Sequence, residues 1–198
     1  GKFADIMFEI GPADEGFTGL QFINDVKGGN IPREYILAAE KGFKSAMSNG
    51  VLAGFPMDSV KVRLYDGSTH PVDSDALSFE TAAHLGFKAA GLKSKPVVME
   101  PIMKVEVRVP SEYLGDVTGD LNRRRALLRE VEATSVIQIV KADAPLSEMF
   151  GYITTLRTLT QGRANYSMEF SHYARLSDDL ADVVIKKAKG TYFFFDKK

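Results

Sequence analysis

The sequence of 198 residues contains no cysteine, only three histidines and no long apolar run. Without cysteine there is neither a disulfide nor a thiolate metal site, and this composition agrees with a cytoplasmic location. The histidines, at positions 70, 84 and 172, lie far apart, so no histidine-based metal site is expected. No apolar stretch approaches the length that spans a bilayer, and Gly1–Asp5 lack the apolar region of a signal peptide. We therefore expect no membrane partner.

The sequence also lacks an excess of positive or negative charge, because its formal net charge is −1. Binding to nucleic acid would then depend on local patches and on shape rather than on a general positive field. Hydrophobic residues make up 44% and charged residues 26%, which are ordinary values for a globular protein. The length suffices for one large domain or two small ones.

Nucleotide and catalytic motifs are missing as well. No G-x-x-x-x-G-K-[ST] loop occurs, and Gly28-Gly29 lacks both the lysine and the hydroxyl with which such a loop holds phosphate and magnesium. No Ser-His-Asp set and no carboxylate pair follows from spacing. The sequence thus predicts no catalytic residue, no metal ligand and no cofactor within this chain.

The first half alternates between strand and helix signals. Residues 4–10 alternate in polarity, which predicts a strand, and apolar residues from Ile36 to Met47 recur at helical spacing before Gly50. Ser74 is the predicted N-cap of the next helix, whose apolar face includes Phe79 and Phe87. Further strands are predicted around residues 20–26, 60–65 and 96–100.

Pro101 is the predicted boundary, after which the pattern restarts as a separate unit. Its order is strand, helix, strand, strand, helix, strand, which is typical of the ferredoxin-like fold, with two helices on one face of an antiparallel sheet. A last helix begins at Leu176-Ser177, and the aromatic tail Tyr192–Phe195 is expected to dock on the first domain or on a partner. The predicted segments of the second unit are 102–109, 110–121, 126–132, 134–142, 145–162 and 164–170.

Three polar segments allow two interpretations each. His70 lies in a strand-to-helix loop, either as an exposed turn residue or as a polar tip that enters a nucleic-acid groove. Lys27–Asn30 is either a simple connection or a second exposed finger. Arg123-Arg124-Arg125 ends a predicted helix, where cations favour the negative end of the dipole but could also hold RNA phosphates.

Several stretches together resemble elongation factor G, in order and in register over nearly the whole chain. They include Gly28–Tyr35, Lys95–Val97 and Glu100–Val107. The most specific are Gly115–Arg125, which contains the three arginines, and Pro145–Tyr152. Asp73-Ser74 with Phe79, Leu156-Arg157 and Gly162–Ala164 follow the same pattern.

This resemblance implies an α+β architecture of two domains. Residues 1–101 resemble domain IV, which is similar to the second domain of ribosomal protein S5, with its usual first strand missing. Residues 102–175 resemble domain V, which is ferredoxin-like. Residues 176–198 then form a C-terminal helix and tail, and the helix is expected to pack back on the first domain.

The resemblance also implies roles. Domain IV is the arm that reaches the decoding centre and the tRNA–mRNA pair during translocation, and domain V lies near the sarcin–ricin loop and the stalk base. GTP and magnesium would bind parts of the parent protein outside this chain, and we expect a monomer. The implied contact residues are Gly28, Gly29, Asn30, Ile31, Pro32, Gly67, Ser68, Thr69, His70 and Pro71, with Arg123, Arg124 and Arg125 as a possible RNA clamp.

Two departures and two alternatives accompany this interpretation. Thr69 stands where an aromatic residue is common in the family, and the aromatic tail extends past the usual end, which suggests a specialised paralogue. A ribosomal protection protein of the tetracycline-resistance type shares these domains, and a stand-alone RNA-binding module is the alternative from another class.

Overall fold

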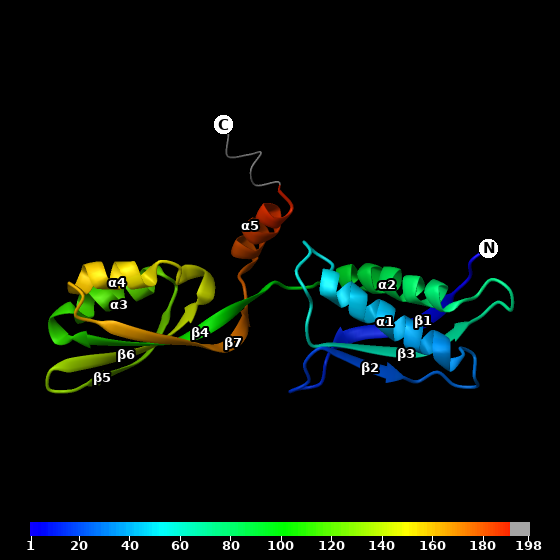
Figure 1. Cartoon of the computed structure of the whole chain (residues 1–198), viewed down its shortest axis with the longest axis horizontal. Helices are drawn as coiled ribbons and strands as arrows, with labels where there is room; N and C mark the ends of the chain where they lie inside the picture. The colour runs from blue at the N-terminus through cyan, green and yellow to red at the C-terminus, as the bar shows by residue number, and fades with distance from the viewer. Residues whose placement is uncertain (191–198) are drawn as a thin grey trace. The chain divides into compact units, whose positions relative to one another are not determined.

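Two separate sheets organise the chain in the computed structural model, which describes residues 1–190. Among the described residues, 1–96 and 179–190 group into one unit, and residues 97–178 form the other. Each unit has its own sheet, its own pair of covering helices and its own hydrophobic core (Figure 1). The sequence prediction of an α+β protein with a ferredoxin-like second half is confirmed.

The sheet of the first unit has three strands in the order β1-β3-β2. Strand β1 (Asp5–Pro12) pairs antiparallel with β3 (Val60–Ser68), and β2 (Leu20–Asn24) pairs parallel with β3. Parallel strands need a crossover connection, and helix α1 (Arg33–Asn49) provides it between β2 and β3. The carboxyl ends of β2 and β3 therefore lie at the same edge of this sheet.

Helices α1 and α2 (Ala76–Lys93) cover one face of this sheet (Figure 1). Both bury residues at helical spacing, as the apolar pattern predicted. The two helices approach closely at Gly42, where an added Cβ would lie 2.2 Å from the carbonyl oxygen of Glu80. The largest side chains fully buried in this core are Phe43, Phe79, Phe87, Leu64 and Val62.

The cap of α2 differs from the expected one. Asp75, not Ser74, is the N-cap, and its carboxylate accepts a hydrogen bond from the Ser78 amide at 2.7 Å. Either residue type can cap a helix, so the sequence alone did not separate them. The hydroxyl of Ser74 is instead engaged in the loop before the helix, which matters for the candidate site below.

The second unit has four antiparallel strands in the order β5-β6-β4-β7. In chain order they are β4 (Met99–Pro110), β5 (Leu127–Ala133), β6 (Ile137–Pro145) and β7 (Asn165–Arg175). Strand β4 continues through Pro101, with a shift in its register against β7 between Ile102 and Met103, so the separate short strand expected at 96–100 does not exist. Over Met99–Pro101 this strand pairs with β7 alone, which is an edge position where a sheet accommodates proline.

Helices α3 (Leu114–Arg123) and α4 (Tyr152–Thr160) cover one face of the second sheet (Figure 1), and short 3-10 turns η1 (Ser111–Tyr113) and η2 (Leu146–Glu148) precede them. Their buried faces meet the valines of β4 in a second core. Helix α5 (Asp178–Ala188) has no buried residue. Its packing on the first domain remains a prediction, and the aromatic tail Tyr192–Phe195 lies outside the described residues. No helix among residues 1–190 is long and apolar enough to cross a membrane.

Candidate functional site

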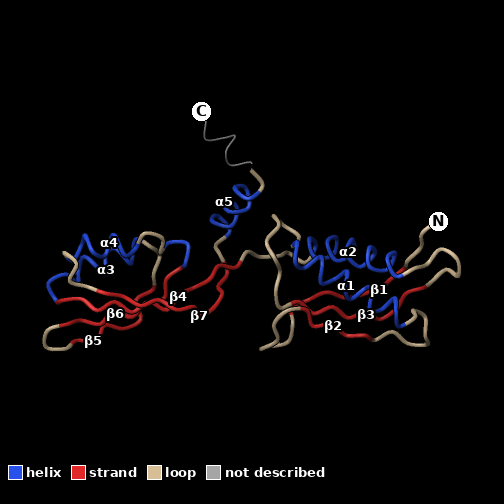
Figure 2. Tube along the Cα trace, viewed as in Figure 1, coloured by secondary structure: helices blue, strands red, loops and turns tan. Residues whose placement is uncertain are grey.

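Two of the predicted loops lie together at one end of the first unit. The loop after β2 and the loop after β3 leave the same edge of the sheet because these strands are parallel neighbours (Figure 2). The Asn30 side-chain amide donates a hydrogen bond to the Asp66 carboxylate at 3.0 Å and joins the loops directly. We call residues 25–32 the first tip loop and residues 66–75 the second tip loop.

The first tip loop has backbone geometry that favours glycine. Gly28 and Gly29 have φ values of 68° and 69°, in the left-handed region that other L-residues rarely adopt. No atom lies within 4 Å of a Cβ built on Gly29, so its requirement is conformational rather than steric. The loop therefore exposes backbone groups at its tip while its end is anchored by Ile31, which is only 2% exposed.

Two of the expected contact residues, Ile31 and Gly67, are buried. The Ile31 side chain and Gly67 pack against each other beneath the loops, and a Cβ on Gly67 would lie 2.6 Å from Ile31 Cδ1 and 2.3 Å from the Asp5 carbonyl oxygen. Both therefore belong to the scaffold, because an apolar side chain and a strand glycine fill the space where the loops meet the sheet. The exposed candidates in the second tip loop are Ser68, Thr69, His70 and Pro71.

A groove of about 320 Å³ lies between the tip loops and the free face of the sheet. Arg63 is central there, since its guanidinium pairs with Glu9 at 2.9 Å and with Asp25 at 2.7 Å and lies 4.8 Å from the centroid of the Tyr65 ring. These two carboxylates raise the pKa of Arg63, and its hydrogen bonds lower the pKa of Glu9. Arg63 is thus occupied within the protein rather than free for a phosphate.

Asp66 is the acidic residue that connects the two loops. Its carboxylate accepts from the Asn30 amide and from the Gly67 backbone N–H at 2.8 Å, and these bonds lower the pKa of Asp66. The tip therefore carries fixed negative charge close to its exposed polar residues.

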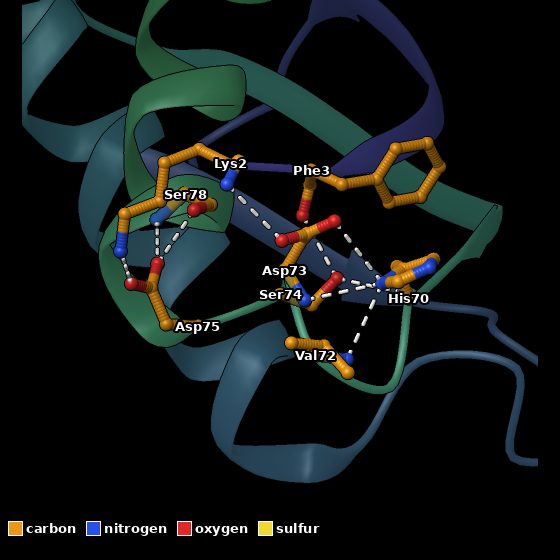
Figure 3. A network of polar contacts seen from close by, with 9 residues as sticks. Lys2, Phe3, His70, Val72, Asp73, Ser74, Asp75 and Ser78 are labelled. Carbon is orange, nitrogen blue, oxygen red and sulfur yellow. Dashed lines mark hydrogen bonds and ion pairs between the residues drawn. The ribbon is translucent and has the colours of Figure 1, made fainter.

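The second tip loop is held by hydrogen bonds that converge on Ser74 (Figure 3). The Ser74 hydroxyl accepts from the His70 backbone N–H and donates to the Phe3 carbonyl, both at 2.8 Å. The Ser74 carbonyl accepts from the Tyr35 hydroxyl of α1 at 3.1 Å. Phe3 makes a second bond to the loop, because its backbone N–H donates to the Asp73 carbonyl at 2.8 Å. The second tip loop is therefore fixed to the segment that precedes β1 and to helix α1.

His70 projects from this framework with half of its side chain exposed. Its Nδ1 accepts hydrogen bonds from the backbone N–H groups of Val72 at 3.3 Å and Asp73 at 3.1 Å. The Phe3 ring lies beside the imidazole, with centroids 6.4 Å apart. Phe3, Tyr35 and Ser74 were not named among the site residues, because their contribution depends on contacts between segments distant in sequence.

The three arginines of the possible clamp point in different directions. Arg124 is directed inward: its side chain is 16% exposed, and it donates to the Asp120 carboxylate at 2.9 Å, the Glu148 carbonyl and the Thr155 hydroxyl. Arg125 pairs with Glu100 at 3.0 Å and Glu148 at 3.2 Å, and these partners raise its pKa. Only Arg123 is largely exposed, with a weaker contact of 3.8 Å to Asp120.

This arrangement changes the expected clamp. Arg124, which is mostly buried, joins α3 to α4, and Arg125, which is 36% exposed, joins the end of α3 to β4, so both guanidinium groups already have carboxylate partners within the protein. Arg123, with 71% of its side chain exposed, is the most accessible of the three arginines. No group of three or more potential metal ligands occurs among residues 1–190.

Comparison with known proteins identifies the family. Residues 1–95 match the family model of elongation factor G, domain IV, and residues 97–184 match that of the elongation factor G C-terminus. The chain belongs to the elongation factor G family. The junction of the two matched regions, at residues 95 to 97, coincides with the junction of the two structural units at 96 and 97.

Individual relatives agree with this family. The chain is 57% identical over 191 residues to elongation factor G of Amoebophilus asiaticus and 54% identical to that of Cytophaga hutchinsonii. Both matches cover 96% of this chain but only 27% of the relative, so the chain spans about a quarter of their length. A crystal structure from Thermus thermophilus matches with a TM-score of 0.85 and 38% identity, over 96% of this chain and 28% of that one.

Proposed function

We propose that this chain is the ribosome-contacting part of a translational GTPase that promotes translocation of tRNA and mRNA in the cytoplasm. The two tip loops carry this proposal. They are fastened to each other and to the sheet, and the exposed polar residues Ser68, Thr69 and His70 stand at their end. A rigid arm with a polar tip suits contact with RNA backbone and bases.

The tip works by position rather than by chemistry. When the tRNA–mRNA pair moves, the arm would fill the vacated decoding site, and the tip loops would meet the RNA. The exposed backbone of Gly28 and Gly29 permits close approach to a phosphate, and His70 offers an imidazole. A loop with preformed hydrogen bonds loses little conformational entropy on contact, which favours a defined arm over a mobile one.

The second unit has a different proposed role. By family resemblance it lies near the sarcin–ricin loop and the stalk base of the large subunit, and Arg123 is its exposed cation at the end of α3. GTP and magnesium would act in parts of the parent that this chain does not span. The chain would then contribute contacts and geometry to the parent's cycle, without hydrolysing GTP itself.

The proposed arm is tested in the full-length factor with His70→Ala. We expect slower translocation with nearly unchanged ribosome-stimulated GTP hydrolysis, because the substitution removes a tip contact and leaves the hydrolytic site intact. His84→Ala, on α2 away from the tip loops, is the matched control and should change neither rate. Equal loss of both rates in His70→Ala would contradict a role at the tip of the arm.

A further inference from the structure

The hydrogen bonds of His70 specify where its ring proton lies. Two backbone N–H groups, from Val72 and Asp73, point at Nδ1 at 3.3 and 3.1 Å. A backbone amide nitrogen can only donate, so the atom that both hydrogens face must offer a lone pair. A neutral imidazole with an unprotonated Nδ1 carries its proton on Nε2. The tautomer thus follows from the network of bonds around the ring.

One neighbouring group favours the other tautomer, in which Nδ1 carries the proton. The carboxylate of Asp73 lies 3.4 Å from Nδ1 and would favour a proton there. That distance is longer than both amide contacts, and the carboxylate is 34% exposed, so solvent weakens its attraction. A proton on Nδ1 would also face the two amide hydrogens and leave both without an acceptor. The two amides therefore outweigh the single carboxylate.

The geometry resembles a turn that asparagine or aspartate side chains make. In an Asx turn, a side-chain oxygen accepts from a backbone N–H two residues further on, and here Nδ1 of His70 accepts from residues 72 and 73. The Ser74 hydroxyl closes the turn from the other side by accepting the His70 N–H. Nδ1 is thus used for structure, while Nε2 makes no hydrogen bond to a residue within 1–190 that would compete for its proton.

We propose that the second tip loop selects the Nε2–H tautomer of the neutral His70 ring, so that Nε2 meets RNA as a hydrogen-bond donor. Its target is an acceptor atom: a phosphate oxygen, a 2′-hydroxyl oxygen or an acceptor on a base edge. The Val72 and Asp73 amides and the Ser74 hydroxyl are positioning groups that set this state without touching the ligand (Figure 3). This inference rests on the proposed contact between His70 and RNA.

The tautomer is measurable on this chain without a ribosome. With histidine labelled by ¹⁵N, at about pH 8.5 where an ordinary histidine is neutral, two-bond nitrogen–proton correlations distinguish a protonated from an unprotonated ring nitrogen. We expect His70 to show an unprotonated Nδ1 and a protonated Nε2. His70→Asn identifies its signals by their loss, and His84 and His172 serve as internal comparisons. An Nδ1–H tautomer or an even mixture of the two tautomers would overturn the proposal.

Two substitutions separate the structural nitrogen from the contacting one. His70→Asn keeps an acceptor near Nδ1 and so keeps the turn, but it lacks the reach of Nε2. His70→Gln places an amide N–H near Nε2 but loses the acceptor. Amide exchange at Val72 and Asp73 should stay slow in His70→Asn and become about tenfold faster in His70→Gln. The opposite order would show that Nδ1 does not hold the turn and would overturn the proposal.

The translocation rate of the full-length factor should depend on the group at the Nε2 position. We expect His70→Asn to lose roughly tenfold in rate, as His70→Ala does, and His70→Gln to retain more of it. If His70→Asn is as fast as the parent, Nε2 is not the contacting group and the inference fails. The NMR result distinguishes the two failures: an Nε2–H tautomer with an active His70→Ala contradicts the proposed RNA contact, and an Nδ1–H tautomer with an inactive His70→Ala contradicts only the proposed donor.

Discussion

The second tip loop and the carboxyl end of α3 both present conspicuous polar residues, but the structure uses them in opposite ways. At the tip loop, hydrogen bonds to the backbone fix the chain and leave half of the His70 side chain exposed. At α3, the side chains of Arg124 and Arg125 are themselves held by carboxylates. The first region is built to present a group, and the second is built to join helices to a sheet.

The two regions differ in which of their polar atoms have hydrogen-bond or ionic partners within the protein. A group whose own atoms are paired internally contributes to stability and specificity of the fold, and breaking it leaves a buried charge without a partner. A group whose backbone is paired but whose end is free can contact another molecule at little cost in order. Substitutions in the two regions should therefore change different observables.

The largest expected effect is on stability at α3. Arg124→Met should destabilise the second unit by about 3 kcal/mol, because the Asp120 carboxylate, 10% exposed, would lose the nearer and more buried of its two cations. Arg123→Met is the matched control and should change stability by no more than about 0.5 kcal/mol, since that side chain is 71% exposed. Urea unfolding followed by circular dichroism measures both. Similar losses in the two variants would remove the distinction drawn between these neighbouring arginines.

A smaller loss is expected where the tip loops join the sheet. Gly67→Ala should destabilise the first unit by about 1–3 kcal/mol, because the added methyl would lie 2.3 Å from the Asp5 carbonyl oxygen and 2.6 Å from the Ile31 side chain. Gly11→Ala is the control in the same sheet, since no atom lies within 4 Å of its Cβ position. Thermal unfolding reports the difference. A neutral Gly67→Ala would mean that the base of the tip is looser than its contacts indicate.

The smallest expected effect is on the stability of the first unit at low pH, where the N-cap of α2 is protonated. Hydrogen bonds from Lys2 and Ser78 lower the pKa of Asp75 below its ordinary value. Its contribution is therefore fully present above about pH 4 and is lost as the pH falls through the lowered folded-state pKa. Asp75→Asn keeps a capping side chain but should flatten this decline in a pH series of unfolding curves. An unchanged acid limb would indicate that Asp75 is not more acidic in the folded chain.

Much of this fold was readable from the sequence, for identifiable reasons. The alternation in β4 and the spacing of Phe79, Ala83 and Phe87 in α2 follow directly from burial of one face. The order of elements after residue 101 was enough for the ferredoxin-like topology. The continuity of β4 through Pro101 was not, because it depends on pairing with β7, some 70 residues later in the chain.

The candidate site was readable only in part. The tip loops and His70 were identified from loop composition and family resemblance, and these are exposed as expected, but Ile31 and Gly67 belong to the scaffold. Sequence also did not reveal that Ser74 fastens the loop while Asp75 caps the helix. Adjacent residues of similar type compete for such roles, and only the contacts of distant Phe3 and Tyr35 decide between them.

The most direct measurement of the central claim is where the tip lies on the ribosome. The chain itself has no cysteine, so in a full-length factor whose other cysteines have been replaced, a single introduced cysteine can carry a tethered hydroxyl-radical probe at a chosen position. With Thr69→Cys in the full-length factor, bound in a post-translocation complex, we predict cleavage of RNA at the decoding centre. Glu15→Cys, in the turn at the opposite end of the same sheet, should give none there. Cleavage of decoding-centre RNA from Glu15→Cys but not from Thr69→Cys would contradict the account.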